Sequence, residues 1–348
     1  MGKILHIADI HIGKNRNFPN PLERYQILIE EILHKIKEHS IDLMILSGDL
    51  LEHPTPSLAE KNLASTLLGE CPVPLALIPG NHERIGKEWN DTTIHWIWEL
   101  TKKSNHIKMW IKPTIEIWND ICWIALPFTG WNQPSFYLVV NWLLEKKIAK
   151  NWKGPLIGLS HEFFHGSLKD NGTLEMGNKK IKLPLIDQID YWALGDIHVR
   201  QKLGPNAYYC GSPLQQNFGE SGKKGGYIYD TISKKVENIN FSKPKRLETF
   251  TTIPKEWPSN VFVKLLCSHE EIPHPLPSFI VSLEIQNSKK ENSEDKDNES
   301  LATSMDLENI IKEGMIKKGI EKNKLEKNLK LFRTLSMQMD AVQVSTHD

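Results

Sequence analysis

The chain has 348 residues, of which 39% are hydrophobic and 25% charged, so it can bury the core of one large domain with appendages. Its 43 basic side chains equal its 43 acidic ones, which excludes recruitment of nucleic acid by overall charge, so a polyanionic partner must be held locally. No stretch reaches the roughly 20 apolar residues of a membrane span and the four cysteines form no CxxC pair, so we expect a cytoplasmic, reduced protein without membrane contact, zinc knuckle or disulfide framework.

The first part of the chain alternates apolar runs of strand character with segments of helical period, which is typical of an α/β layer architecture. Apolar residues recur at helical spacing from Leu22 to Ile36, and Ser57 with Glu60 forms a capping box that predicts a helix over 58–68. Around these helices we expect strands within 3–10, 42–49 and 74–81. The pattern indicates successive βαβ units.

Consecutive strands dominate the next part. The Trp-rich segment 90–100 and the run 136–150 have helical patterns. The expected strands lie within 111–118, 120–127, 155–161, 191–196, 206–211 and 225–232.

Side chains that bind metals recur where these strands end. They are Asp9, His11, Asp49, Asn81, His82, His161, Asp196 and His198. Because a site in an open α/β sheet forms at the carboxyl ends of the strands, we expect them to converge. Carboxylates, imidazoles and an amide oxygen without a thiolate suit hard or borderline divalent cations, and this number of ligands favours two ions over one. Each motif alone is more often a loop cap, a turn or a packed histidine; the ordered set favours a shared metal site.

The order of these motifs resembles that of the calcineurin-like metallophosphoesterases. The matching stretches are "DIH" at 9–11, "GD" at 48–49, "GNHE" at 80–83, His161 and "GDIH" at 195–198. The segments "ADIHIG", "GDLLEHPTPS", "YWALGDIHVRQ" and "YYCGSPLQQNFGE" are similar to those of SbcD-type DNA repair exonucleases, over about residues 1–245. The resemblance implies an α/β fold, a four-layer β-sandwich flanked by helices, with a small α+β cap and C-terminal helices.

The resemblance also implies roles for the ligands, with Mn²⁺ as the expected metal and Mg²⁺ as the alternative. Asp9, His11 and His198 would hold the first ion. Asp49 would bridge both ions, and Asn81, His161 and Asp196 would hold the second. The family usually has His at the position of Asp196, so Asp196 is either a ligand that favours harder ions or a group that acts through hydrogen bonds outside the ligand shell.

Catalytic roles follow from the same resemblance. Two metals can clamp the attacking and the leaving oxygens of a phosphoryl displacement, and His82 would be the acid that assists the leaving oxygen. A second family histidine follows the GD motif. By spacing its closest match is Glu52, with His53 one residue late, so His53 is a candidate catalytic residue. Arg200 and the lysines near Gly222 are either phosphate contacts or ordinary solvated groups.

The pattern changes after residue 245. Two short strands, near 261–266 and 279–285, predict a small capping domain over 246–286. The polar stretch 287–305 predicts a flexible linker, and 306–340 carries an amphipathic helical stripe. This stripe either folds back on the cap or, as the resemblance implies, docks on the coiled coil of an SbcC-type ATPase.

We therefore predict a Mn²⁺-dependent DNA nuclease, exonuclease or endonuclease, that hydrolyses phosphodiester bonds by a two-metal mechanism in DNA repair or recombination. Its expected partners are DNA, an SbcC-type ATPase and a second copy in a homodimer. The alternatives are a metallophosphoesterase acting on nucleotides or phosphoproteins and a catalytically silent scaffold that kept the fold.

Overall fold

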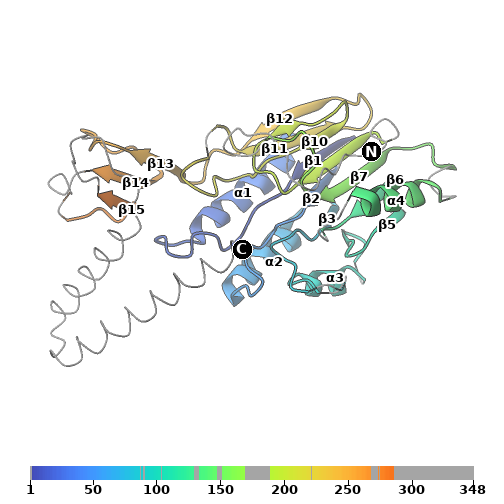
Figure 1. Cartoon of the computed structure of the whole chain (residues 1–348), viewed down its shortest axis with the longest axis horizontal. Coiled ribbons are helices and arrows are strands. Elements are labelled where there is room, and N and C mark those ends of the chain that lie inside the picture. Colours follow the sequence, from blue (N-terminus) through green and yellow to red (C-terminus); the bar gives the residue numbers. More distant parts are fainter. Residues whose placement is uncertain are drawn as a thin grey trace, which may run out of the picture. The chain divides into compact units, whose positions relative to one another are not determined.

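Two six-stranded β-sheets form the centre of the protein (Figure 1). The first sheet has the order β12-β11-β1-β2-β3-β4 and the second β5-β6-β7-β8-β10-β9. The computed structural model describes residues 2–86, 88, 91–102, 104–128, 133–146, 151–168, 189–220, 222–267, 273 and 275–285.

The first sheet is parallel where it carries the βαβ pattern. The parallel strands are β1 (Lys3–Ile7), β2 (Leu43–Ser47), β3 (Leu75–Ile78) and β4 (Ile107–Met109). β11 (Gly225–Asp230) pairs antiparallel with β1, and β12 (Val236–Asn240) pairs antiparallel with β11. The chain thus returns to the first strand after completing the second sheet.

The second sheet has four parallel inner strands, β6 (Ile121–Leu126), β7 (Leu156–His161), β8 (Tyr191–Gly195) and β10 (Ala207–Tyr209). Its antiparallel edges are β5 (Thr114–Trp118) and β9 (Gln201–Lys202). The inner strands are nearly continuous apolar runs because both faces of such a sheet are covered.

The two sheets bury an apolar layer between them, which includes Ile45, Ile78, Trp123 and Leu159. His6 of β1 crosses this layer as a polar bridge. Its Nδ1 lies 2.8 Å from the Tyr191 hydroxyl of the second sheet and its Nε2 lies 2.7 Å from Ser47 Oγ. The side chain is fully buried, and burial lowers the pKa of His6 to about 3.

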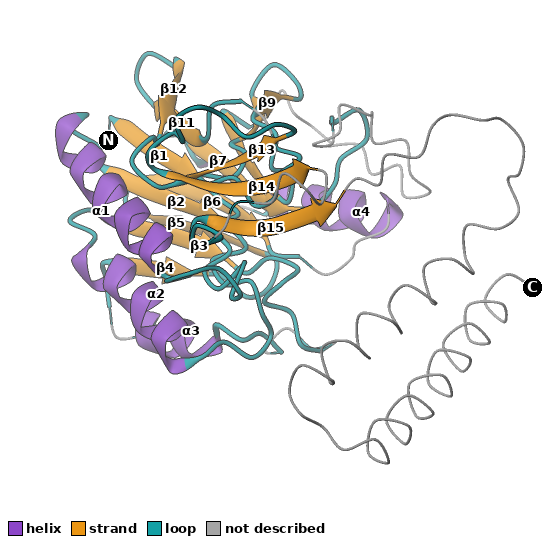
Figure 2. Ribbon diagram, turned by 90° about the vertical axis from the view of Figure 1, so that its left-hand side faces the viewer, coloured by secondary structure: helices purple, strands orange, loops and turns teal. Residues whose placement is uncertain are grey.

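Helices cover the outer faces of the two sheets, which makes four layers. α1 (Glu23–Glu38), α2 (Leu58–Glu70) and α3 (His95–Thr101) pack on the first sheet, and Figure 2 shows them stacked along one side of the strands. α4 (Gln133–Leu144) packs on the second sheet through Phe136, Val140 and Leu143. The predicted four-layer fold is therefore confirmed.

The capping box predicted at the start of α2 is present. Ser57 Oγ accepts from the Glu60 amide at 3.3 Å, and the Glu60 carboxylate accepts from the Ser57 amide at 2.6 Å. Two strands of the first sheet were not predicted. β4 has only three residues and β12 is a polar edge strand with the sequence VENIN, so neither carries a strong apolar pattern.

A third, three-stranded sheet of parallel strands follows residue 245. It contains β13 (Arg246–Phe250), β14 (Val261–Cys267) and β15 (Ile280–Ile285), in that order. β13 adds one strand to the two expected there. Gln215 ties this sheet to the rest through hydrogen bonds with both backbone groups of Leu247. The capping role of 246–286 stays a prediction, and the predicted linker 287–305 and helical segment 306–340 lie outside the described residues.

Within the described ranges, no helix is both long enough and apolar enough to cross a lipid bilayer.

Candidate metal centre

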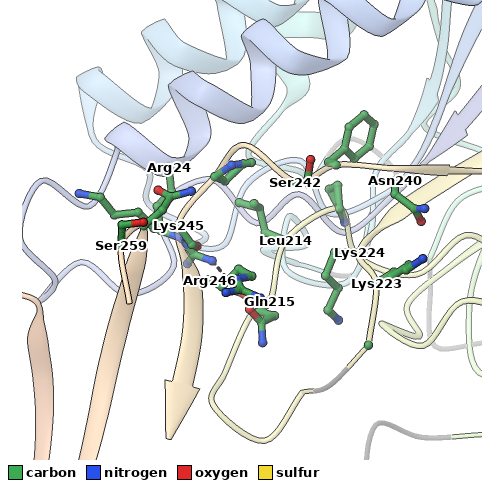
Figure 3. A pocket seen from close by; sticks show the side chains of 15 residues that line it. Arg24, Leu214, Gln215, Lys223, Lys224, Asn240, Ser242, Lys245, Arg246 and Ser259 are labelled. Atoms are coloured by element: carbon green, nitrogen blue, oxygen red, sulfur yellow. Dashed lines mark hydrogen bonds between the residues drawn. The ribbon is translucent and has the colours of Figure 1, made fainter. Parts of the chain in front are cut away.

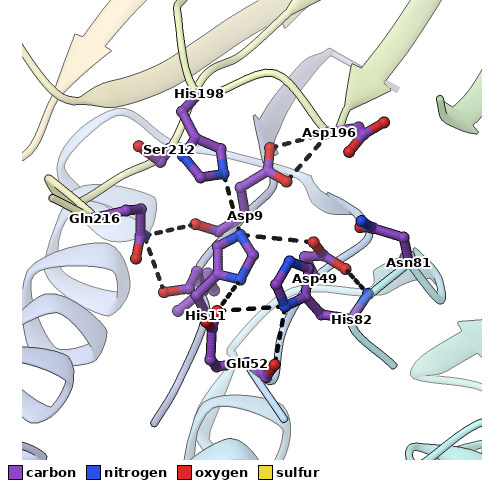
Figure 4. Close-up of polar contacts among 12 residues, drawn as sticks. Asp9, His11, Asp49, Glu52, Asn81, His82, Asp196, His198, Ser212 and Gln216 are labelled. Carbon is purple, nitrogen blue, oxygen red and sulfur yellow. Dashed lines mark hydrogen bonds and ion pairs between the residues drawn. The ribbon is translucent and has the colours of Figure 1, made fainter. Parts of the chain in front are cut away.

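Five parallel strands from both sheets deliver the candidate ligands to one place (Figure 4). Those of the first sheet follow the ends of β1, β2 and β3, whereas His161 ends β7 and Asp196 and His198 follow β8. Four candidates have positive φ angles: Asp9 at 56°, His11 at 54°, Asp49 at 53° and Asp196 at 89°. Such backbone strain in non-glycine residues persists where the surrounding structure enforces it, and it clusters at functional sites.

Small residues beside the ligands are required by the close approach of the strand ends. A Cβ atom on Gly195 would lie 2.1 Å from the Ser47 carbonyl oxygen and 2.7 Å from His161 Nδ1. A Cβ on Gly80 would lie 2.1 Å from Asp49 Oδ1. Gly195 of the "GDIH" motif thus lets the two sheets approach each other at the site, and Gly80 of the "GNHE" motif leaves room for Asp49.

Asp49 lies between the two imidazoles that the resemblance assigns to different ions. Its Oδ2 is 3.5 Å from His11 Nε2 and 3.4 Å from His161 Nε2, and its Oδ1 accepts from the His82 amide at 3.0 Å. This placement suits the predicted bridging role. Three groups of side chains offer ligand atoms within 4.8 Å of one another: Asp9, His11 and His198; Asp9, Asp49 and His161; and His11, Asp49 and His82.

The second predicted ligand set also gathers around His161. Its Nε2 lies 3.0 Å from Asn81 Oδ1 and 3.8 Å from Asp196 Oδ1. The Asp196 amide donates to both oxygens of Asp9, at 3.1 and 3.3 Å. Asp196 therefore stands where its side chain can reach an ion held by His161, while its backbone orients Asp9. Its role as a ligand stays a prediction.

The outward nitrogen of each ligand imidazole is held by an acceptor. His11 Nδ1 lies 2.7 Å from Glu52 Oε2, His161 Nδ1 lies 2.7 Å from the Ser47 carbonyl oxygen, and His198 Nδ1 lies 3.1 Å from Glu220 Oε1. Carboxylates and carbonyls only accept hydrogen bonds, so Nδ1 carries the proton in each neutral ring and Nε2 keeps its lone pair. Such outer partners are the usual companions of metal-binding histidines.

These lone pairs converge in a way that fits bound cations. His11 Nε2 and His198 Nε2 are only 3.2 Å apart, and in the tautomers fixed by Glu52 and Glu220 both are acceptors. A divalent cation satisfies both nitrogens and the nearby carboxylates at once. The donors, imidazole nitrogens with carboxylate and amide oxygens, suit Mn²⁺ and related divalent ions.

The electrostatics of the cluster let protons compete with cations for these groups. Burial lowers the pKa of His161, but the carboxylates of Asp49, Asp196 and Asp9 outweigh burial and raise this pKa well above its usual value. Burial raises the pKa of Asp196 to about 8. Burial also opposes ionisation of Asp49, but His161 and His11 outweigh it and lower the pKa of this carboxyl.

His82 differs from the other histidines in its access to solvent. Its side chain is 35% exposed, whereas those of His11 and His161 are 1% and 0% exposed. His82 Nδ1 lies 2.9 Å from the Glu52 carbonyl oxygen, so its Nε2 is the nitrogen left for an incoming group. This position suits the predicted acid, although His82 also belongs to one of the three groups with ligand geometry.

Glu52, and not His53, contacts the ligands after the GD motif. Besides His11, the Glu52 carboxylate pairs with Lys14 at 3.3 Å. His53 is half-buried and makes no hydrogen bond or ion pair with a candidate ligand in the described part of the chain. Its catalytic role stays a prediction.

Three further residues support the centre and were not singled out from the sequence. Glu83 accepts from the Leu51 amide at 3.0 Å and the Gly80 amide at 2.9 Å, which joins the loops after β2 and β3. Glu220 holds His198, and Gln216 Nε2 donates to the Asp9 carbonyl oxygen at 3.1 Å. The available signal was adjacency: Glu83 directly follows the "GNH" motif, and Gln216 and Glu220 lie in the segment "GSPLQQNFGE".

Arg200 has a structural role in this region. Its guanidinium donates to the carbonyl oxygens of Gly226 and Ile239 and to Asn240 Oδ1. It therefore fastens the loop after β8 to β11 and β12.

A comparison with protein families agrees with this geometry. The family model "calcineurin-like phosphoesterase" matches residues 2–200, which contain every candidate ligand. Among solved structures, TT1561 of Thermus thermophilus is 15% identical, with a TM-score of 0.46, over 69% of this chain and 98% of that one. An archaeal phosphodiesterase is 11% identical, with a TM-score of 0.35, over 69% and 99%. GAP50, the anchor in the inner membrane complex of Plasmodium, is 14% identical, with a TM-score of 0.41, over 84% and 99%. The match over more than half of its length shows that the chain belongs to the calcineurin-like phosphoesterase family, whose members use divalent metal ions.

Proposed function

We propose that the protein is a Mn²⁺-dependent DNA nuclease that hydrolyses phosphodiester bonds in DNA repair or recombination. The observation that supports this proposal most strongly is the convergence of six side chains from both sheets, with Asp49 Oδ2 about midway between His11 and His161. They are His11, His161, His198, Asp9, Asp49 and Asp196. Asp9, His11, His198 and Asp49, with Asn81, His161 and Asp196, would hold two divalent ions, which would supply charge stabilisation for both oxygens of the displacement and an activated attacking water.

The side chains of the protein would orient the ligands and supply a proton. Glu52, Glu220 and the Ser47 carbonyl hold the ligand imidazoles in one tautomer. His82, the histidine of this group with the most exposed side chain, would give a proton to the leaving oxygen, a step that typically contributes about 10²- to 10⁴-fold in rate; its exposure supports this role.

The choice of DNA rests on the SbcD-like segment "GSPLQQNFGE". Its Gln216 and Glu220 contact the Asp9 backbone and His198, so the segment is part of the centre. The proposal includes an SbcC-type ATPase as partner, bound through 306–340, and a homodimer.

A comparison of hydrolysis rates on different substrates tests the proposal. Labelled single- and double-stranded DNA should be cleaved by the full chain with Mn²⁺ faster than a small phosphodiester and a phosphomonoester. Asp49→Asn, which removes the bridging charge, is the matched inactive control. Cleavage of the monoester alone would instead assign a nucleotide or phosphoprotein phosphoesterase. No hydrolysis of any substrate by a metal-loaded chain would indicate a silent scaffold.

A further inference from the structure

A basic cavity of about 640 Å³, shown in Figure 3, is lined by none of the candidate metal ligands. Its walls come from residues around Leu214, the loop before β11, the end of β12 and the start of β13. Its 15 lining residues, all described, include five cations and no aspartate or glutamate. The cations are Arg24, Lys223, Lys224, Lys245 and Arg246.

Arg24 is a buried charge without a carboxylate partner. The residue is 2% exposed. Its Nε donates to the Lys245 carbonyl oxygen at 3.0 Å and its Nη2 to the Gln215 carbonyl oxygen at 3.2 Å. No ion pair of Arg24 occurs among the residues that the structure describes. Because a buried charge is costly unless a counter-charge meets it, this guanidinium favours an anion in the cavity.

The other cations leave a further surplus of positive charge. Lys224, Lys245 and Arg246 pair with Glu220, Glu23 and Glu248, none of which lines the cavity. Lys223 is exposed and forms no ion pair in the described ranges. Arg24 and Lys223 therefore leave two positive charges on the wall without carboxylate partners.

The cavity connects to the metal centre through one carboxylate. Glu220 Oε2 pairs with Lys224 at 2.5 Å and its Oε1 lies 3.1 Å from His198 Nδ1. Glu220 would thus link an anion bound to Lys224 with His198, which is a candidate metal ligand.

From these contacts we propose that the cavity binds a phosphate group at a site separate from the metal centre. A guanidinium with further N–H donors and several lysine ammonium groups suit a doubly charged tetrahedral anion. The phosphate belongs either to a small molecule or to the backbone of a nucleic acid strand. The second source rests on the proposed nuclease function; the site itself does not.

Calorimetry on the full chain at low salt tests the site. EDTA treatment and dialysis remove metal, so no metal-bound phosphate contributes to the signal. Inorganic phosphate should bind one site, and Lys223→Gln should weaken it about two- to fivefold, as expected for an exposed charge pair. Arg24→Gln should weaken it about tenfold or more. Lys61→Gln, on the exposed face of α2, is the matched control and should match wild type.

The outcomes distinguish the two sources of phosphate and show which results overturn the proposed site. Displacement of phosphate by a single-stranded oligonucleotide identifies a backbone site, whereas phosphate binding that the oligonucleotide leaves unchanged identifies a small-molecule site. Absence of phosphate binding, or equal affinities of Lys223→Gln and Lys61→Gln, overturns the proposal. If Arg24→Gln fails to fold, the double variant Lys223→Gln/Arg246→Gln replaces it. Loss of the nuclease hypothesis would not change the phosphate result.

Discussion

Replacing Glu52 tests whether metal affinity depends on the hydrogen bonds behind the ligands. Its Oε2 lies 2.7 Å from His11 Nδ1 and fixes the tautomer that turns Nε2 toward the centre. Burial opposes ionisation of Glu52, but His11 outweighs it and lowers the pKa of this carboxyl to about 2, so the group is charged at neutral pH. Loss of such an outer partner typically weakens metal binding about 10- to 100-fold, or about 1.4 to 2.7 kcal/mol.

Two variants separate the charge from the hydrogen bond. Glu52→Gln keeps an oxygen acceptor for His11 and should weaken Mn²⁺ binding about tenfold, whereas Glu52→Ala removes the acceptor and should approach 100-fold. The shorter contact of His82, 2.9 Å to the Glu52 backbone carbonyl, should remain in both variants, whereas its 3.5 Å contact with the Glu52 carboxylate is lost in Glu52→Ala.

The measurement is a Mn²⁺ titration by calorimetry on the full chain at fixed pH. Glu99→Gln is the control, because Glu99 is 51% exposed on α3 and pairs with Lys102 and His95. Affinities of both Glu52 variants within twofold of wild type would refute the claim that Glu52 orients His11.

Three further predictions concern protons and turnover. His82→Ala should retain Mn²⁺, measured by elemental analysis, while turnover falls about 10²- to 10⁴-fold; loss of metal would reassign His82 as a ligand. Because burial raises the pKa of Asp196 to about 8 and neighbouring carboxylates raise that of His161, Mn²⁺ binding at pH 7 should release protons and weaken as pH falls, and calorimetry in buffers of different ionisation enthalpy measures this. The pKa of His6 is lowered to about 3 by burial, so the unfolded chain binds the extra proton first and stability is lost as pH falls below about 6.5. This group should cost about 2 kcal/mol of unfolding free energy at pH 5 relative to pH 7.5; an equal pH dependence in His6→Gln, followed by guanidinium denaturation, would contradict it.

The layers of the fold and the ligand set were predictable because they follow from local patterns. Each candidate ligand lies at the end of an apolar strand or within four residues after it, and parallel strands place their carboxyl ends at the same edge of a sheet. The capping box of α2 also acts within four residues. The short strand β4 and the polar edge strand β12 were missed, because only pairing with distant strands stabilises them.

The supporting carboxylates depend on contacts that no spacing rule encodes. Glu220 reaches His198 across 22 residues and Glu52 reaches His11 across 41. His53 satisfied the expected residue type, but the loop after β2 turns the neighbouring Glu52 toward the ligands. The basic cavity likewise combines residues from α1, the β11 and β12 region and β13, and the sequence showed its lysines only as a loop near Gly222.

Asp196 makes the centre more negative than the family pattern, which usually has His at this position. With Asp9 and Asp49 it places three carboxylates around His161 Nε2, at 4.0, 3.4 and 3.8 Å for Asp9, Asp49 and Asp196. Burial raises the pKa of Asp196 to about 8 and the neighbouring carboxylates raise that of His161, so protons on these two groups would offset this charge when no cation is bound. A histidine at position 196 would be a neutral ligand and would add no negative charge that a proton or a cation must offset. A second ion held at His161 would therefore meet one more negative charge here, and we expect this to strengthen the attraction of a hard divalent cation and to make its binding depend more steeply on pH.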